Sequence, residues 1–368
     1  MSSGRRRALR FFLSNLGLSL AITAALLAGG EITVRVWGPK PDRGDFHERL
    51  PASPRRWRLR PGARGVVGGE SLVVNSIGMR DREYTIEKPA RVARIAVLGD
   101  SYAFGNGVPA AATFVKVLER EMNANRRAGV RYEVMNFGVK GYDTTQESAT
   151  LREVALPLDP DVLIVAYFLN DVGDPERFVP GGEPARGGGR DADGEAPTRA
   201  PGRAGAVPAR MRIREFLVSR SRLAGFLIQQ IAIAVRSVVS VPYQGVVDYN
   251  LPFVENDETW RGSKAALREI KAVADSIAAP MMVVIIPEMG NFNERYPFRA
   301  AHDTLATFCA EIGVPTCDLL GGFMGLEAKR LWVAPDDPHF NRRAHRLAAE
   351  QIARALEANG LLWPAERR

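Results

Sequence analysis

The stretch RIAVLGDSYAFGNGV, residues 94–108, decides the fold of this chain. A short apolar run ends in Gly99, Asp100 and Ser101, and a polar, glycine-rich segment follows it. This pattern is typical of a buried strand that turns directly into a helix. Ser101 fits two roles at such a turn, because Ser and Asp cap helix N-termini and a serine hydroxyl can also serve as a nucleophile. The residues elsewhere in the chain must distinguish between the two.

Apolar runs alternate with amphipathic helical patterns around this stretch. Short apolar runs occupy residues 94–100, 132–139, 160–171, 281–287 and 315–320, and helical patterns occupy residues 114–125, 144–158, 260–278, 299–313 and 341–360. Continuously apolar strands that alternate with helices predict an α/β fold, in which a parallel sheet is covered by helices on both faces. Ligands of such sheets gather at the carboxyl ends of the strands.

The positive charge of the chain is confined to its N-terminal region. The formal net charge is +8, and residues 1–60 hold twelve Lys/Arg against four acidic residues, so residues 61–368 are formally neutral. A nucleic-acid-binding domain would carry its basic residues on a face of the folded part. We therefore expect no nucleic-acid partner.

An uncharged segment of twenty residues, 11–30, follows the basic cluster at residues 5–10. A helix of that length rises about 30 Å, the thickness of the hydrocarbon core of a bilayer. We expect residues 1–31 to form a cytoplasmic basic tail and a single-pass anchor in the inner membrane, with the remaining chain periplasmic. A cleaved signal peptide, which would leave a secreted protein, and a buried helix stay open as alternatives.

The rest of the chain divides by composition. Residues 32–91 predict a membrane-proximal connector with short strands, and residues 92–362 predict the main domain with an insertion at residues 172–258. Within the insertion, residues 180–208 are rich in Gly, Pro, Ala and Arg, which predicts disorder. Residues 211–241 are apolar with regularly placed Arg, which predicts a helical lid or packing helix, with membrane contact as the alternative.

Two cysteines, Cys309 and Cys317, lie close together in the sequence. An exported protein can keep a disulfide between them, and two buried free thiols are the equally open alternative. No CxxC motif or Cys/His cluster accompanies them, so the sequence predicts no metal site.

Polar residues follow several of the predicted strands. Gly141 and Asn170 each come after an apolar run, and Asp336 precedes His339 by three residues just before the last helix. A neutral His is the usual base for a serine nucleophile, and an acidic residue holds the His in the correct tautomer. The backbone N–H groups of Ser101 and Gly141, with the amide of Asn170, could stabilise an oxyanion. The pattern predicts acyl transfer through Ser101.

These residues give the chain a resemblance to the SGNH (GDSL-like) hydrolase superfamily. GDSYAFG at residues 99–105 matches the first block of that family, and NFGVKG at 136–141, FLND at 168–171 and DDPH at 336–339 resemble later blocks in family order. The resemblance implies a three-layer α/β/α, flavodoxin-like domain with a five-stranded parallel sheet. It also implies no metal and no cofactor.

The resemblance assigns roles residue by residue. The implied catalytic residues are Ser101, Asp336 and His339, and the implied oxyanion-hole residues are Ser101, Gly141 and Asn170. The doubled acid leaves Asp337 as an alternative to Asp336. Phe168 stands where the third block usually has Gly, and we expect it to make the mouth of the pocket bulkier. The remaining histidines are expected to be structural: His47, His302 and His345.

The sequence as a whole therefore predicts a serine-dependent carboxylic-ester hydrolase that works through an acyl-enzyme. Its expected partners are the membrane and an acylated carbohydrate, such as an envelope glycan, or a small ester from which it removes acetyl or short acyl groups. Three alternatives remain: an O-acetyltransferase that uses the same triad on exopolysaccharide, a non-catalytic envelope-binding or scaffold protein, and a lipase with residues 211–241 as its lid.

Overall fold

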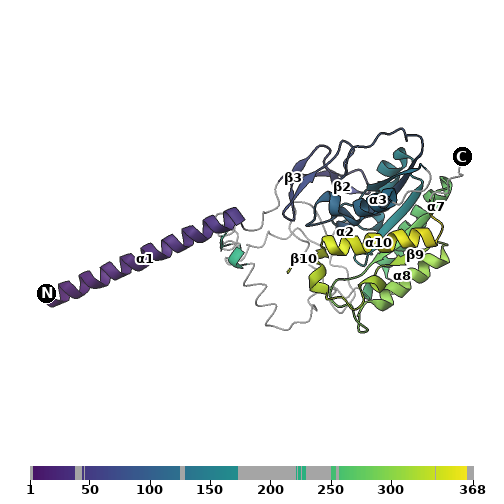
Figure 1. Cartoon of the computed structure of the whole chain (residues 1–368). Helices are drawn as coiled ribbons and strands as arrows, with labels where there is room; N and C mark the ends of the chain where they lie inside the picture. The colour runs from purple at the N-terminus through teal and green to yellow at the C-terminus, as the bar shows by residue number, and fades with distance from the viewer. Residues whose placement is uncertain are drawn as a thin grey trace, which may run out of the picture. The chain divides into compact units, whose positions relative to one another are not determined.

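The chain forms two compact units. The computed structural model describes residues 3–37, 44, 46–124, 129–172, 221, 223–224, 226–228, 250–253, 257–335 and 337–362. One unit contains the N-terminal helix, and the other contains the sheet of the main domain (Figure 1). The segment 180–208, for which disorder is predicted, lies outside the described residues, as does most of the predicted lid helix at 211–241.

The N-terminal unit is built on α1 (Ser3–Trp37). Its stretch Gly17–Val36 is long and apolar enough to cross a membrane, which suits either an anchor or a signal sequence. Near the end of this helix, Glu31 Oε2 accepts hydrogen bonds from Ser221 Oγ at 2.8 Å and from Leu223 N at 3.0 Å. A described piece of the insertion therefore contacts α1 within this unit.

The main domain is organised around a five-stranded parallel sheet. Its strands are β5 (Val92–Gly99), β6 (Arg131–Asn136), β7 (Val162–Phe168), β8 (Met281–Ile286) and β9 (Thr316–Asp318). They are ordered β6-β5-β7-β8-β9, and every neighbouring pair is parallel. In sequence order this is the flavodoxin-like arrangement 2-1-3-4-5, whose ligands bind where the winding reverses, at the carboxyl ends of the first and third strands. Those strands are β5 and β7.

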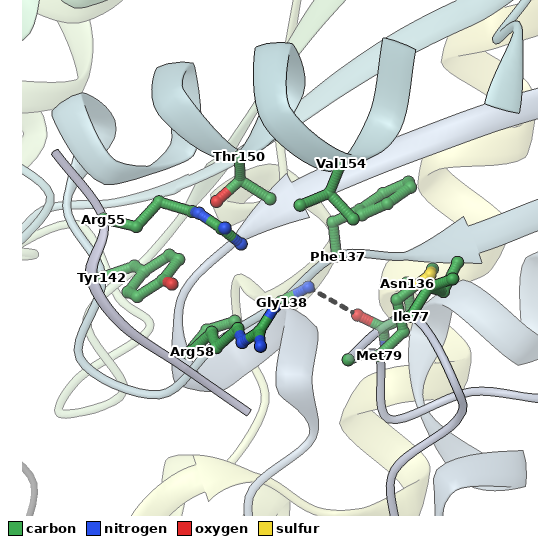
Figure 2. A pocket seen from close by; sticks show the side chains of 12 residues that line it. Arg55, Arg58, Ile77, Met79, Asn136, Phe137, Gly138, Tyr142, Thr150 and Val154 are labelled. Atoms are coloured by element: carbon green, nitrogen blue, oxygen red, sulfur yellow. Dashed lines mark hydrogen bonds between the residues drawn. The ribbon is translucent and has the colours of Figure 1, made fainter. Parts of the chain in front are cut away.

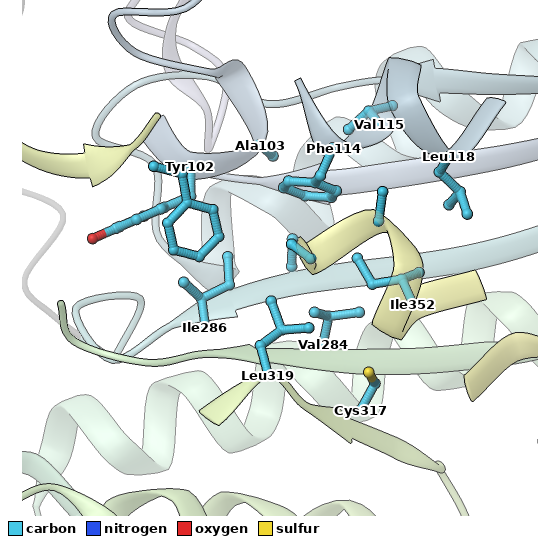
Figure 3. Close-up of a cluster of buried hydrophobic side chains, with 14 of the residues drawn as sticks. Tyr102, Ala103, Phe114, Val115, Leu118, Val284, Ile286, Cys317, Leu319 and Ile352 are labelled. Atoms are coloured by element: carbon cyan, nitrogen blue, oxygen red, sulfur yellow. The ribbon is translucent and has the colours of Figure 1, made fainter. Parts of the chain in front are cut away.

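Helices cover both faces of the sheet. The helices of the layers are α3 (Phe114–Ala124), α4 (Thr144–Thr150), α7 (Glu258–Ser276), α8 (Arg299–Glu311) and α10 (Arg342–Ala358). Alternate residues of β5 belong to different cores: Ile95 shares one with α3 and α10, and Ala96 shares the other with α7 and α8. Figure 3 shows the first of these cores, in which Phe114 of α3 and Ile352 of α10 take part. A strand buried on both faces must be apolar throughout, as residues 94–99 largely are. The predicted three-layer α/β/α fold is confirmed.

Smaller elements complete the main domain. They are β1 (His47–Leu50), β2 (Arg56–Leu59), β3 (Arg64–Val67), β4 (Glu70–Val73), α2 (Ser101–Phe104), α9 (Leu320–Phe323), β10 (Trp332–Ala334) and β11 (Asp337–Phe340), with short 3-10 or π turns at Ala110–Ala112, Leu151–Ala155, Leu156–Leu158, Leu251–Phe253 and Ala328–Leu331. The antiparallel hairpins β1–β2 and β3–β4 come from the predicted connector. Their apolar side chains form a third core with Phe104, Val139 and Tyr142, so the connector packs onto loops at the carboxyl edge of the sheet.

The two cysteines are free and buried. Cys309 packs in the core on one face of the sheet, and Cys317 belongs to the core on the other face. Burial raises the pKa of each thiol to about 12, so neither is a reactive thiolate near neutral pH. The free-thiol alternative therefore describes this structure.

His345 makes a pH-dependent contribution to stability. Its Nδ1 accepts a hydrogen bond from Phe114 N at 3.0 Å, and burial, aided by the charges of His339 and Arg80, lowers its pKa from 6.5 to about 3. As the pH falls, this histidine is protonated in the unfolded chain near pH 6.5, well before it is protonated in the folded chain. The contribution is therefore complete above pH 6.5 and is lost as the pH falls from there towards 3.

We expect His345→Asn, which keeps an acceptor but does not titrate, to remove this dependence. Between pH 7.5 and 5.0 the wild type should lose about 2 kcal/mol of unfolding free energy more than the variant. Urea unfolding at several pH values measures the difference. Stability curves that stay parallel over this range would contradict the assignment.

Candidate active site

Ser101 lies at the first position of α2, directly after β5. Asp100 caps the helix, since its side chain accepts a hydrogen bond from Tyr102 N at 2.8 Å. A Cβ on Gly99 would lie 2.8 Å from the Cβ of Ala103, so the sharp turn from strand to helix needs a glycine there. The turn leaves Ser101 8% exposed at the carboxyl edge of the sheet. The two roles open from the sequence are thus compatible, because Ser101 begins a helix and its hydroxyl faces a base.

The candidate base is His339, on the hairpin β10–β11. Its Nε2 lies 2.8 Å from Ser101 Oγ, and its Nδ1 lies 2.5 Å from Asp337 Oδ1. When His339 carries its proton on Nδ1 and hydrogen-bonds it to the carboxylate, Nε2 is unprotonated. Its lone pair can then accept the proton of the serine hydroxyl, as a general base requires. The imidazole side chain is 23% exposed, so a substrate can reach it.

The acid in contact with His339 is Asp337. Burial pushes the pKa of Asp337 upward, but the hydrogen bonds and charge of His339, with the charge of Lys140, outweigh it and hold that pKa below its ordinary value. Asp337 is therefore ionised at neutral pH. Asp336, the first choice from the D-x-x-H spacing, lies outside the described residues. The described geometry favours Asp337.

The predicted oxyanion residues lie at the ends of strands that flank β5. Gly141 follows β6 with a φ of +83°, a backbone conformation that favours glycine. Asn170 follows β7 in a turn held by Asp171, whose Oδ2 accepts a hydrogen bond from Phe168 N at 2.7 Å. The Oδ1 atom of Asn170 is buried and has no hydrogen-bond partner among the described residues. The Nδ2 group of the same amide is the atom that could donate to an oxyanion.

The loop that carries Gly141 packs tightly against the nucleophile helix. Asn136 Oδ1 accepts a hydrogen bond from Gly138 N at 2.9 Å (Figure 2), and Asn136 Nδ2 donates to Ala103 O at 2.7 Å. A Cβ on Gly138 would lie only 2.3 Å from Phe104 N. A small void of about 20 Å³ lies behind this loop and is lined in part by Arg58 and Gly138.

Aromatic rings pack beside the catalytic histidine. The ring of Tyr102 lies 4.6 Å from that of Phe168, 5.0 Å from that of His339 and 4.8 Å from that of Phe340. Phe168 is only 6% exposed, since it lies beneath Tyr102 in the core. The side chain of Phe168 therefore packs against Tyr102, the residue next to Ser101.

Three buried carboxyl groups lie near Ser101: Asp100, which contacts its hydroxyl, and Glu147 and Asp171, whose charges interact with Asp100. Burial raises the pKa of Asp100, Glu147 and Asp171, and the negative charges of these neighbours raise the pKa of Glu147 and Asp171 further. Asp100 Oδ2 is a second acceptor for the Ser101 hydroxyl, at 3.2 Å.

Two residues near the site were not singled out in the sequence. Asn106 Nδ2 donates to Asp337 Oδ2 at 3.0 Å, and the buried Arg80 binds the loop that carries Asn106. The only local signal is the pair of glycines on either side of Asn106, since nothing in the sequence links it to a residue 231 positions away. The histidines His302 and His345 are held in buried hydrogen bonds, as structural residues would be.

Known proteins with related sequences and structures can now be compared with this chain. The model of the GDSL-like Lipase/Acylhydrolase family matches residues 97–347, which is more than half of the chain. No curated protein matches it.

Several solved structures are similar at low identity. A putative lipolytic protein of the G-D-S-L family from Desulfitobacterium hafniense is 10% identical with a TM-score of 0.39, over 72% of this chain and 99% of that one. TesA is 13% identical with a TM-score of 0.42, over 72% and 98%. Axe2, an acetylxylan esterase from Geobacillus stearothermophilus, is 15% identical with a TM-score of 0.41, over 72% and 94%. Likeness at this level carries no functional argument.

The family match covers the end of β5, the turn that carries Ser101 and the hairpin that carries His339. It confirms the resemblance noted in the sequence, and the family acts on ester bonds. The chain belongs to the GDSL-like Lipase/Acylhydrolase family and is an ester-bond hydrolase.

Proposed function

We propose that this protein is a serine-dependent hydrolase that removes acetyl or short acyl groups from an envelope glycan or a small ester. The observation that carries the proposal is the continuous chain of contacts from Ser101 through His339 to Asp337, at 2.8 Å and 2.5 Å. A nucleophile, a base and an orienting acid in this geometry are the parts that acyl transfer needs. Membership of an acylhydrolase family argues against the non-catalytic scaffold.

The first half-reaction forms an acyl-enzyme. His339 Nε2 takes the hydroxyl proton as Ser101 Oγ bonds to the acyl carbon, and the electrons of the carbonyl move onto its oxygen. Donors at Ser101 N, Gly141 N and the Asn170 amide stabilise this oxyanion. When the carbonyl re-forms, the bond to the alcohol oxygen breaks, and the departing alcohol takes the proton from His339.

The second half-reaction restores the enzyme. His339 Nε2 removes a proton from water as the water oxygen bonds to the acyl carbon. Collapse of the second oxyanion breaks the bond to Ser101 Oγ, which recovers the proton from His339, and the carboxylic acid leaves. Asp337 stays ionised throughout and balances the imidazolium charge.

The proposed substrate class depends on the side of the membrane on which the catalytic domain lies. An N-terminal helix that can cross a membrane, preceded by basic residues, favours an anchored domain outside the cytoplasm. Acylated envelope glycans are esters found in that compartment. The apolar segment at 211–241 supplies the reason to test for a lipase.

Hydrolysis of p-nitrophenyl esters from acetate to palmitate by the full-length chain in detergent micelles tests the proposal. We expect the highest kcat/KM on acetate or butyrate, and labelling of Ser101 by a fluorophosphonate should abolish turnover. A maximum on long chains would establish a lipase instead. Turnover that rises when an oligosaccharide acceptor is added, with acyl product on the sugar, would establish the O-acetyltransferase. No labelling-sensitive release on any ester from a folded chain would overturn the proposal.

Asn170→Ala tests the oxyanion role of the amide. We expect kcat to fall about 10²- to 10³-fold with KM little changed, because the donor acts mainly on the charge of the transition state. Steady-state kinetics on p-nitrophenyl acetate measure the effect. Asn359→Ala, which removes an exposed amide at the end of α10, serves as the matched control. A fall of less than threefold in Asn170→Ala would show that the amide takes no part.

A further inference from the structure

Asn106 and His339 each form a hydrogen bond with the carboxylate of Asp337, on different oxygens. Asp337 Oδ1 accepts a hydrogen bond from His339 Nδ1 at 2.5 Å, while Asp337 Oδ2 accepts a hydrogen bond from Asn106 Nδ2 at 3.0 Å. A carboxylate with a donor on each oxygen has a single favoured rotation about its Cβ–Cγ bond. Asn106 is 5% exposed, so water cannot easily replace its amide.

The backbone around Asn106 is held by Arg80. Arg80 Nη1 donates to Phe104 O at 2.8 Å and to Gly105 O at 2.7 Å, and its Nη2 donates to Val108 O at 2.7 Å. The guanidinium is 1% exposed, and desolvation lowers the pKa of Arg80 to about 10, despite the charge of Glu70. Three hydrogen bonds offset the cost of burying this cation. All three go to backbone carbonyls on either side of Asn106.

The loop is also closely packed on both sides. Gly105 and Gly107 have φ angles of +80° and +75°, and a Cβ on either would lie 2.3 Å from a side-chain atom, of Thr113 and Val333 respectively. Val333 lies on β10, the strand that pairs with the one carrying Asp337. A Cβ on Gly68, in the turn between β3 and β4, would lie 2.7 Å from Gly107. Asn106 is thus fixed between the hairpin of the catalytic pair and a hairpin of the connector.

We propose that Asn106 is a positioning residue for Asp337, held in place by Arg80. This inference rests on the proposed function. Arg80 lies outside residues 97–347, so the connector supplies part of the support for the catalytic pair. The amide donor favours the ionised carboxylate and prevents its rotation away from His339 Nδ1. The other groups that influence this pair are Lys140, whose charge acts on Asp337, and Asp100, which faces Ser101.

The first readout is kinetic and compares two variants in the full-length protein. Asn106→Ala removes the donor, and Asn106→Asp keeps the shape but places a second carboxylate beside Asp337. We expect kcat to fall about 10- to 100-fold in each, the loss of a hydrogen bond to a charged group, with KM little changed. Asn123→Ala removes a half-buried amide that binds backbone far from the site, and it should leave kcat unchanged.

The second readout is the Nδ1 proton of His339 in a histidine-labelled protein, observed by NMR. The chain has four histidines, and His339→Gln assigns the signal by its loss. In the wild type the short bond to Asp337 should place this proton far downfield, and both Asn106 variants should broaden or lose it. The Nδ1 proton of His302, whose Nδ1 atom lies 3.0 Å from Asp318 Oδ2, is an internal control that should not change.

The two readouts separate this inference from the proposed function. A lost His339 signal in the Asn106 variants supports positioning even if the wild type fails to turn over esters, and that failure alone would overturn the proposed function. A wild type that turns over esters, together with Asn106 variants whose kcat and His339 signal both match it, would overturn the positioning role and leave the function standing.

Discussion

Ser101→Ala is expected to lower kcat/KM on p-nitrophenyl acetate by about 10⁶-fold. The methyl group cannot bond to the acyl carbon, so no acyl-enzyme forms, and His339 Nε2 loses the hydroxyl that lies 2.8 Å away. What remains is binding and any stabilisation of a direct attack by water. The measurement is initial rates at saturating and low ester, with fluorophosphonate labelling of the wild type and the variant.

The matched control for this prediction is Ser276→Ala. Ser276 lies at the exposed end of α7, where its hydroxyl donates only to Val273 O, and its loss should leave kcat unchanged. Thermal unfolding should show both variants folded, since Ser101 is a helix N1 residue whose cap, Asp100, stays in place. Residual ester turnover in Ser101→Ala within tenfold of the wild type would mean that another group is the nucleophile.

Asp337→Asn is expected to lower kcat/KM by about 10³- to 10⁴-fold. An amide NH₂ in place of Oδ1 would face the Nδ1 proton of His339, so the imidazole would have to present Nδ1 as the acceptor and Nε2 as the donor. In that tautomer Nε2 cannot take the proton of Ser101. KM should change little, because the loss concerns the transition state.

Asp336→Asn is the decisive comparison for this prediction, because it removes the adjacent acid and leaves Asp337. If Asp337 orients His339, kcat in Asp336→Asn should stay within a few-fold of the wild type. A large loss in Asp336→Asn together with a small one in Asp337→Asn would restore the acid predicted by the D-x-x-H spacing. It would also remove the basis of the role inferred for Asn106.

The three-layer arrangement, a sheet between two layers of helices, could be predicted because burial on both faces makes each central strand apolar on its own. Residues of β7 and β8 are buried on both faces, and such strands are recognisable as unbroken apolar runs without knowledge of their neighbours. Ser101 could be placed for a similar reason, since the turn that presents it is made by residues within a few positions. The small hairpins were less visible, because four-residue strands such as β1 and β2 are too short for a clear period of two.

Asp337 shows that spacing alone does not choose between the two adjacent acids. Asp337 and His339 lie two residues apart on β11, and alternate side chains of a strand point to the same face. The spacing D-x-x-H selects Asp336 only if the segment is not extended, and the extended form depends on pairing with β10. A three-residue partner strand has no sequence pattern of its own.

By itself the sequence determined the parallel α/β fold and the order of its strands along the chain, because each strand is marked by residues close together in the chain. It also singled out Ser101 and His339 as the candidate nucleophile and base. Only the tertiary structure decided which acid contacts His339, that Asn106 and Arg80 hold that acid, and that Phe168 is packed rather than exposed. The contact between Asn106 and Asp337 joins residues 231 positions apart, and the place of Phe168 depends on its packing against the ring of Tyr102, so no local pattern encodes either outcome. The physical reason is that hydrogen bonds and packing select among side chains only after the backbone has brought them within a few ångströms.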